Sequence, residues 1–359
     1  MAIKTDTNQQ FYTKIHKVAR EKRFPLRVMF ELTYKCNFNC LHCYVPQNYR
    51  KESVLNELKA KQIFSILDQL AEIGCFYLGF TGGEPFLRKD IMRILWYAKK
   101  RGFEVIIYTN GSLINEKVAD ELKRLRPNKV DITIPAISKD AFERISGLVG
   151  SRDKVFGAID LLHKKGVNLG FKSCVLKENE SQINQIQDFA ASLNALHRLD
   201  DMLSPCLDGS KEPYKYRGSL KPVTRNQSTE TRDKESDEYY FQTENREPKT
   251  GNLFKCGVGR NQVAITPLGE LKMCLMIDYP KYRILRTSLG ECWQRLKELV
   301  KNIKPDGDYR CDRCELKAYC KWCPAEGWLE NRHFTSCVPE SRANAERIKD
   351  SLHSQHSIV

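Results

Sequence analysis

The sequence contains no run of about 18 consecutive apolar residues, so we expect no membrane-spanning helix. Its first residues are polar and basic, and they lack the apolar stretch that a secretory signal requires. These two absences predict a cytoplasmic protein. The 359 residues are enough for a sizeable hydrophobic core, in one large domain or in two.

Acidic residues are outnumbered by basic ones. The chain has 59 lysines and arginines against 45 aspartates and glutamates, which gives a formal net charge of +14. An excess of this kind can attract nucleic acid or acidic peptides. No block of basic residues is interleaved with aromatic residues, as it is in proteins that bind single-stranded nucleic acid. We therefore expect a solvated basic surface and no nucleic-acid partner.

Cysteine, in contrast, is abundant, with 14 residues. Disulfide-stapled domains are much shorter than this chain, because their crosslinks replace a core that they cannot build. Most of the cysteines stand in short clusters that include C-x2-C pairs, a spacing typical of metal ligands. The cysteine pattern predicts metal binding rather than disulfides.

Three cysteines near the N-terminus form the most informative cluster. Cys36, Cys40 and Cys43 have C-x3-C-x2-C spacing, and three thiolates this close can hold three corners of a [4Fe–4S] cubane. A ferredoxin would close the fourth corner with another cysteine. A structural zinc site would fill four positions, usually with two C-x2-C pairs or with histidines. The open corner predicts chemistry at the fourth iron.

Between residues 26 and 206, apolar runs alternate with segments of helical periodicity six times. Strands that alternate with helices imply parallel pairing with right-handed crossovers. We predict an α/β fold, a partial (β/α)6 barrel of the TIM type, with its site at the carboxyl ends of the strands. The expected strands are 26–34, 76–83, 103–111, 129–135, 167–176 and 199–205.

Composition divides the rest of the chain. We predict a basic N-terminal extension at 1–25, the barrel at 26–206 and a polar bridge between domains at 207–255. A cysteine-rich C-terminal domain follows at 256–345, with a tail at 346–359.

The motif CNFNCLHC resembles the signature of the radical S-adenosylmethionine (SAM) enzymes. Three further motifs support the resemblance: TGGEP after the second strand, YTNG after the third, and a small hydroxyl residue on the fourth. Glycines permit a close backbone approach to a ligand, and a glutamate can accept hydrogen bonds from an ammonium group. The resemblance implies that SAM binds the open iron and contacts His42, Gly82, Gly83, Glu84, Thr109, Asn110 and Thr133.

The C-terminal cysteines resemble the SPASM extension of radical SAM enzymes that modify peptides and proteins. The resemblance implies two auxiliary [4Fe–4S] clusters, although zinc is an alternative occupant of C-x2-C pairs. Asn261 stands where some relatives have a further cysteine, and Leu275 stands where one class of relatives has an aspartate that accepts a proton. The implied ligands are Cys311, Cys314, Cys320 and Cys337 for one cluster, and Cys256, Cys274 and Cys323 for the other.

Four other cysteines, Cys75, Cys174, Cys206 and Cys292, are expected to be core residues rather than ligands. Cys206, which follows the sixth strand, is the one of these that most merits a test.

Three functions remain open. The first is a maturase that uses a 5′-deoxyadenosyl radical to crosslink or oxidise a peptide or protein side chain. The second is a radical enzyme acting on a small molecule such as a tetrapyrrole or a sugar, and the third is a non-catalytic iron–sulfur electron carrier. The first implies a peptide or protein substrate and an electron donor such as flavodoxin or ferredoxin. About 25 residues precede the first strand, too few for a leader-binding domain, so it also implies either a separate leader-binding protein or an unusual substrate. The sequence identifies no catalytic acid or base.

Overall fold

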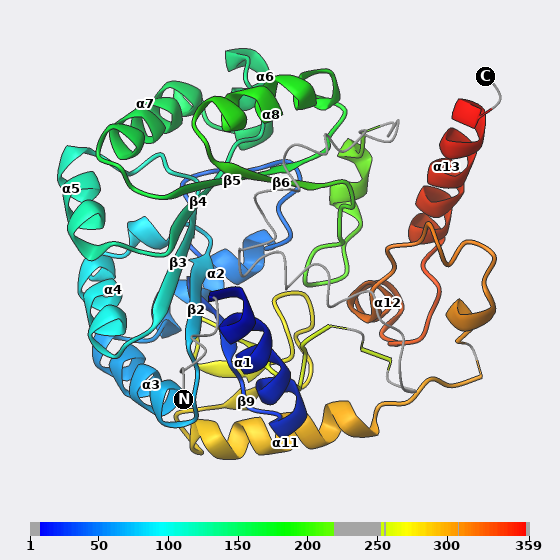
Figure 1. Cartoon of the computed structure of the whole chain (residues 1–359), viewed down its shortest axis with the longest axis horizontal. Helices are drawn as coiled ribbons and strands as arrows, with labels where there is room; N and C mark the ends of the chain where they lie inside the picture. The colour runs from blue at the N-terminus through cyan, green and yellow to red at the C-terminus, as the bar shows by residue number, and fades with distance from the viewer. Residues whose placement is uncertain (1–7, 219–252, 255, 308, 357–359) are drawn as a thin grey trace, which may run out of the picture.

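The computed structural model describes residues 8–218, 253–254, 256–307 and 309–356. Within them a single sheet of nine strands has the order β6-β5-β4-β3-β2-β1-β7-β8-β9. Helices cover one face of the sheet and follow its curve (Figure 1). No helix in these residues is long and apolar enough to cross a membrane. Most of the predicted bridge at 207–255 lies outside the described residues.

The six predicted strands are confirmed, with helices between each consecutive pair, and neighbouring strands from β1 to β6 are parallel. The helical region before the fifth strand consists of two helices, and β6 lies a few residues earlier than expected. The elements are β1 (Arg27–Thr33), α2 (Gln47–Asn56), α3 (Ala60–Glu72), β2 (Tyr77–Gly82), α4 (Ile91–Lys100), β3 (Glu104–Thr109), α5 (Glu116–Leu125), β4 (Lys129–Thr133), α6 (Lys139–Ser146), α7 (Ser151–Lys164), β5 (Leu169–Cys174), α8 (Ile183–Ser192) and β6 (Leu196–Asp200).

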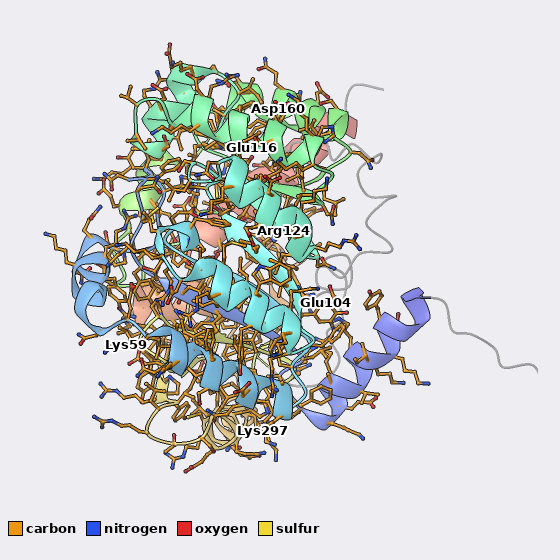
Figure 2. All side chains as sticks on the ribbon, turned by 90° about the vertical axis from the view of Figure 1, so that its left-hand side faces the viewer. Lys59, Glu104, Glu116, Arg124, Asp160 and Lys297 are labelled. Atoms are coloured by element: carbon orange, nitrogen blue, oxygen red, sulfur yellow. The ribbon has the colours of Figure 1, made fainter. Side chains whose placement is uncertain are left out.

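Amphipathic helices explain why one face of the sheet is covered. In α3, Ile63, Ile66, Leu67 and Leu70 recur at three- and four-residue steps and are all buried. The opposite faces of the helices carry charge, as Glu116, Arg124 and Asp160 show on the outer layer (Figure 2). Burial of the apolar stripes fixes the helices on the sheet, which leaves the other sheet face for the site.

The C-terminal region continues the same sheet, which the predicted domain boundary at 256 does not anticipate. The strand β7 (Gln262–Ile265) pairs parallel with β1. The strands β8 (Glu270–Lys272) and β9 (Tyr282–Arg283) then add antiparallel. Without β7, β1 would present an unpaired edge, and an exposed edge is a liability.

Helices outside the barrel complete the structure: α1 (Asn8–Lys22), α11 (Leu289–Asn302), α12 (Pro324–Asn331) and α13 (Pro339–His356). The segment predicted as an N-terminal extension therefore contains a helix, and Ala19 of α1 is buried with Leu26 and Tyr77. The predicted boundary at 345 falls inside α13, which is one continuous helix.

Candidate active site

The three N-terminal cysteines lie in the loop between β1 and α2, at the carboxyl edge of the sheet. Backbone hydrogen bonds attach this loop to the end of α6: the Asn39 N–H donates to the Ser146 carbonyl at 2.8 Å, and the Leu41 N–H donates to the Ile145 carbonyl at 3.0 Å. The Asn37 side chain donates to the Ser112 hydroxyl at 2.8 Å. Contacts from two other parts of the barrel therefore position the cysteine loop.

Nitrogen donors surround the sulfurs of this loop. Arg50 Nη2 lies 3.0 Å from Cys43 Sγ, and the Phe38 N–H donates to Cys36 Sγ at 3.4 Å. Burial raises the pKa of the Cys36 and Cys40 thiols, and for Cys40 the neighbouring cysteines raise it further. Buried thiolates need a cation and hydrogen-bond donors to be stable. The nitrogen donors around Cys36 and Cys43 therefore fit cysteines that bind iron as thiolates.

No three His, Cys, Asp or Glu side chains within the described residues are arranged to hold one metal ion. The thiolates of a single zinc ion lie within about 4 Å of one another, because each Zn–S bond is about 2.3 Å. A cubane needs a wider spacing, since each thiolate binds a different iron. The wider arrangement is the one that the sequence predicts for Cys36, Cys40 and Cys43.

Gly82 and Gly83 are explained by a close approach between two parts of the chain. A Cβ at Gly82, whose φ is +136°, would lie 2.2 Å from the Thr33 carbonyl oxygen. A Cβ at Gly83 would lie 2.1 Å from the Lys35 carbonyl oxygen. The sequence analysis attributed both glycines to a ligand; in the structure they also allow the end of β2 to approach the end of β1 and the start of the cysteine loop.

Replacing Gly83 with alanine is therefore expected to displace the cysteine loop and to lower the free energy of unfolding by about 1–3 kcal/mol, because the added methyl meets backbone atoms. Gly157→Ala on α7 is the matched control, since a Cβ there meets nothing within 4 Å. Urea unfolding and iron content after reconstitution measure the two effects. Equal stability and iron content in the two variants would contradict this explanation.

Glu84 links the TGGEP and YTNG segments. Its side chain is fully buried, and its two oxygens accept hydrogen bonds from Thr109 Oγ1 at 2.8 and 2.9 Å. They also accept from the Asn110 N–H at 2.7 Å and the Phe86 N–H at 3.0 Å. The carboxylate predicted to meet an ammonium group thus has four protein contacts. Burial raises its pKa to about 7.

This raised pKa predicts how stability depends on pH. Between about pH 4.5 and about pH 7 the folded protein keeps a proton on Glu84 that the unfolded chain releases, so stability falls as pH rises, by at most about 3 kcal/mol. Urea unfolding across this window, on identically reconstituted proteins, should show a steeper decline for the wild type than for Glu84→Gln. Parallel curves would show that the carboxyl titrates normally.

Asn110, His42 and Thr133 complete the predicted SAM contacts. The Asn110 amide nitrogen donates to Asn37 Oδ1 at 3.0 Å and lies 3.9 Å from Cys36 Sγ, so it contacts the cysteine loop. Thr133 ends β4 and pairs with Lys172 of β5. Burial lowers the pKa of His42 to about 4, and the positive charge of Lys172 on β5 lowers it further. The charge of Asp200 on β6 also acts on the imidazole, so His42 lies near these two strands. Of the predicted contacts, Gly82, Gly83 and Asn110 approach the start of the cysteine loop, and His42 lies within it.

Several of the C-terminal cysteines are close enough to one another to interact electrostatically. Burial raises the pKa of Cys323, and Cys256 and Cys274 are close enough to raise it further. Burial likewise raises the pKa of Cys320, with contributions from Cys337 and Cys314. Cys311 precedes Cys314 in the same short turn, where the Cys314 N–H donates to the Cys311 carbonyl at 3.4 Å.

The other four cysteines are not among the predicted ligands. Cys75 and Cys292 are buried core residues. Cys174 ends β5, and Cys206 is buried with its thiol 3.5 Å from the Cys43 carbonyl oxygen. Cys206 therefore contacts the backbone of the cysteine loop.

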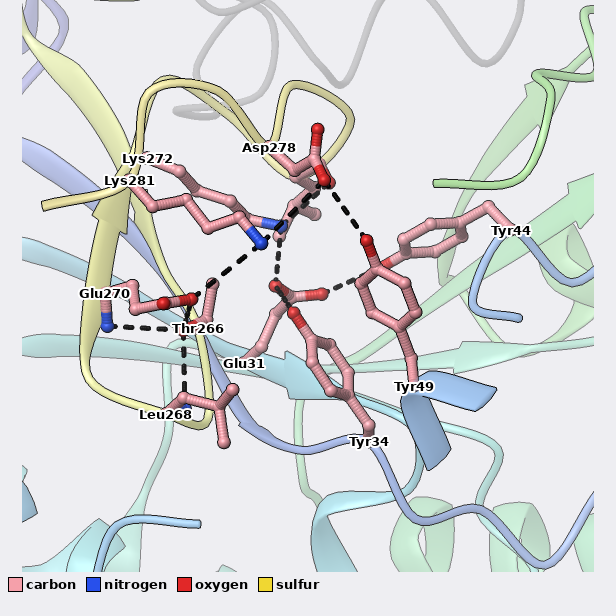
Figure 3. A network of polar contacts seen from close by, with 11 residues as sticks. Glu31, Tyr34, Tyr44, Tyr49, Thr266, Leu268, Glu270, Lys272, Asp278 and Lys281 are labelled. Carbon is pink, nitrogen blue, oxygen red and sulfur yellow. Dashed lines mark hydrogen bonds and ion pairs between the residues drawn. The ribbon is translucent and has the colours of Figure 1, made fainter. Parts of the chain in front are cut away.

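A buried ion pair connects the N-terminal and C-terminal cysteine-bearing regions, and the sequence analysis missed it. Lys272 Nζ lies 2.9 Å from Glu31 Oε2, and both side chains are fully buried (Figure 3). The Tyr34 and Tyr44 hydroxyls each donate to Glu31 at 3.3 Å. Tyr44 follows Cys43, and Lys272 precedes Cys274 by two residues. The only sequence signal is a glutamate inside the apolar strand β1.

Residues 30–190 match the model of the radical SAM superfamily. A probable GTP 3′,8-cyclase of Sulfurisphaera tokodaii is 30% identical over 257 residues, which cover 68% of this chain and 79% of the relative. This chain belongs to the radical SAM superfamily. The resemblance to radical SAM enzymes that the sequence analysis stated is confirmed at the level of the superfamily.

Two other relatives of this radical SAM protein bear on its function. The subtilosin biosynthesis protein AlbA of Bacillus subtilis is 24% identical over 351 residues, covering 92% of this chain and 74% of AlbA. Fe-coproporphyrin III synthase of Methanosarcina barkeri is 29% identical over 161 residues. That match covers 45% of this chain and only 40% of the relative, so it spans less than half of the relative's length.

Solved structures show the same fold. The structure of Streptococcus suis SuiB bound to SAM superposes with a TM-score of 0.67 and 15% identity, over 94% of this chain and 84% of SuiB. The structure of anSMEcpe with bound SAM gives a TM-score of 0.66 and 16% identity, over 92% and 98% of the two chains. The predicted partial barrel with a cysteine-rich C-terminal region is confirmed.

Proposed function

We propose that this radical SAM enzyme modifies a peptide or protein side chain, as a maturase. The observation that carries the proposal is the match to AlbA, which continues through the barrel and the C-terminal cysteines over 92% of this chain. The structures of SuiB with its precursor peptide and of anSMEcpe with peptides share the fold. The net charge of +14 suits a substrate with acidic residues.

In this proposal Cys36, Cys40 and Cys43 hold the cluster whose open iron binds SAM. When bound, the reduced cluster and SAM supply a 5′-deoxyadenosyl radical that abstracts hydrogen from the substrate. Arg50 and the Phe38 N–H stabilise the thiolates through hydrogen bonds to sulfur. The protein's task is to orient the substrate and to exclude competing reactions.

Different residues around this cluster would hold different loops of the site in place. Glu84, with Thr109 and Asn110, fixes the loops after β2 and β3 against the cysteine loop, and Gly82 and Gly83 permit their close approach. His42 and Thr133 lie on the side of β4 to β6, where SAM would meet the substrate.

The two C-terminal cysteine groups would hold auxiliary [4Fe–4S] clusters. Cys311, Cys314, Cys320 and Cys337 supply four thiolates, whereas Cys256, Cys274 and Cys323 supply three. Their proposed role is to accept the electron left on the substrate radical or to anchor the substrate. An electron donor such as flavodoxin or ferredoxin and a separate leader-binding protein are the proposed partners.

The short peptides encoded beside the gene test the substrate class. Each is incubated with reconstituted enzyme, SAM and dithionite, and its mass is measured. The proposal predicts a mass change in one peptide that depends on SAM and on Cys40. Unchanged peptides, with SAM still cleaved, would contradict the maturase proposal.

A small-molecule substrate is the second candidate, favoured by the similarity to Fe-coproporphyrin III synthase. The test is the same assay with an iron-loaded tetrapyrrole in place of the peptide. Modified tetrapyrrole together with unchanged peptides would favour this candidate. An electron carrier, the third alternative, would cleave no SAM in either assay.

A further inference from the structure

We propose that the buried pair of Lys272 and Glu31 sets how readily the metal centre at Cys274 accepts an electron. The inference rests on the proposed function, in which Cys274 is a ligand of an auxiliary iron–sulfur cluster. It deepens that function by naming the residues that tune this cluster. Neither residue is a proposed iron ligand, so both would act on the cluster through their charges.

The surroundings of Cys274 fit a cysteine that binds iron as a thiolate. Burial raises the pKa of its thiol to about 11, and Cys256 raises it further. The Met276 and Ile277 N–H groups and the Lys272 ammonium lower this pKa, because they favour the ionised sulfur. A thiolate at this position therefore has both hydrogen-bond donors and a cation near it, as a buried cluster ligand requires.

Lys272 holds its positive charge close to Cys274. Its Nζ atom donates to the Leu275 carbonyl at 3.0 Å, and Leu275 directly follows Cys274. The Lys272 side chain is fully buried, so solvent and salt screen its charge little. Since β8 ends at Lys272, the strand fixes this cation at the start of the loop that carries Cys274.

Glu31 opposes that charge from the strand β1. Its Oε2 atom lies 2.9 Å from Lys272 Nζ, and its Oε1 atom accepts from the Tyr44 hydroxyl at 3.3 Å (Figure 3). Burial raises the pKa of Tyr44, and Glu31 and the cysteines Cys43 and Cys274 raise it further. The ion pair therefore belongs to a buried network that borders both cysteine-bearing regions.

The signs of the two charges give the expected effect of each residue. Reduction adds one electron to the cluster and makes it more negative, and in the proposed function the substrate radical loses that electron. The Lys272 cation stabilises the reduced cluster, whereas the Glu31 carboxylate destabilises it. Removing either charge should therefore move the midpoint potential, and the two removals should move it in opposite directions.

Two substitutions test this expectation on anaerobically reconstituted protein, by redox titration followed with electron paramagnetic resonance. Glu31→Gln should favour reduction about tenfold, which raises the midpoint potential by about 59 mV for a one-electron couple. Lys272→Met should lower the potential by a similar amount. The double variant Glu31→Gln/Lys272→Met buries no unpaired charge and should lie between them, so it replaces Lys272→Met if that protein does not fold. A pair with only a structural role would shift both single variants in the same direction.

Three controls separate this pair from net charge and from the loss of a hydrogen bond. Lys272→Arg keeps the cation and should keep the wild-type potential. Tyr34→Phe removes a neutral hydroxyl that donates to Glu31 at 3.3 Å, and should shift the potential much less than Glu31→Gln. Lys164→Met on α7 removes an exposed lysine paired with Asp160 at 2.6 Å and should shift nothing. A shift in Lys164→Met equal to that in Lys272→Met would overturn the assignment to the buried pair.

Cysteine variants assign the shifted signal to one cluster. The shift should persist in a Cys40→Ala background, which is expected to lack the N-terminal cluster, and the signal should be absent from Cys274→Ala. Unchanged potentials in both single variants, or a shift confined to the N-terminal cluster, would overturn the inference.

The outcomes also distinguish the inference from the proposed function. Unshifted potentials together with a modified peptide would overturn the tuning role alone. Shifted potentials together with unmodified peptides would support the tuning role and contradict the maturase proposal. Equal iron content in the wild type and in Cys274→Ala would show that no cluster forms there, which would overturn the inference whatever the peptide assay shows.

Discussion

Cys40→Ala protein is expected to bind about four fewer iron atoms than the wild type after anaerobic reconstitution, and to form no 5′-deoxyadenosine from SAM. Cys40 lies in the middle of the cysteine trio, and both of its partners act electrostatically on its thiol. In this variant only two of the four irons would have a thiolate ligand from the protein. We therefore expect the cubane not to be retained. Iron analysis and mass spectrometry of the nucleoside measure the two losses.

Cys75→Ala is the matched control for that experiment. Cys75 is a buried residue that precedes β2, and its thiol donates to the Tyr77 carbonyl at 3.6 Å, at the opposite end of the strand from the cysteine loop. The control should retain full iron content and SAM cleavage. If Cys40→Ala cleaves SAM at the rate of Cys75→Ala, the predicted role of the cysteine trio is wrong.

Lys272→Met is expected to lower the free energy of unfolding by about 3–5 kcal/mol, because it leaves Glu31 charged, buried and without its cation. The hydroxyls of Tyr34 and Tyr44, which donate to Glu31 (Figure 3), are neutral and cannot replace the lysine charge. Urea unfolding of cluster-free protein measures the loss, so that changes in iron binding do not contribute.

The double variant Glu31→Leu/Lys272→Met is the informative comparison. Replacing a whole buried pair with apolar side chains is often neutral or stabilising, so the double variant should be more stable than either single variant. A double variant whose loss equals the sum of the two single losses would show that the charges act independently. That result would contradict a stabilising ion pair between Glu31 of β1 and Lys272 of β8.

The barrel could be predicted from the sequence because its strands are apolar runs that alternate with amphipathic helices. The strand β1 is buried almost throughout, and the buried residues of α3 follow helical periodicity. The N-terminal cysteine trio could be predicted as a metal site from its spacing, because Cys36, Cys40 and Cys43 lie within one short loop. These features are local, and local patterns are visible in a single sequence.

Contacts between distant segments could not be predicted in the same way. The strands β7 to β9 are two to four residues long, too short to show periodicity, and they form because β1 offers a free edge. Pairing of Glu31 with Lys272 depends on that sheet extension. The pairing of Lys172 with Arg198 likewise depends on the register of β5 with β6. Register is a tertiary property that composition does not reveal.

Gly83 and Glu84 show a different limit. Their residue types suggested direct ligand contacts, but the structure gives both of them partners within the protein. A motif identifies residues that a site requires, and only the geometry distinguishes a residue that contacts a ligand from one that supports the loops around it.

The central claim is that SAM binds the open iron of the cluster held by Cys36, Cys40 and Cys43. Electron–nuclear double resonance on reduced, reconstituted protein, with SAM isotopically labelled at its amino nitrogen, tests it most directly. We predict a magnetic coupling between the labelled nitrogen and the cluster, lost in Cys40→Ala. Bound SAM, verified by equilibrium dialysis, that shows no such coupling would contradict the claim.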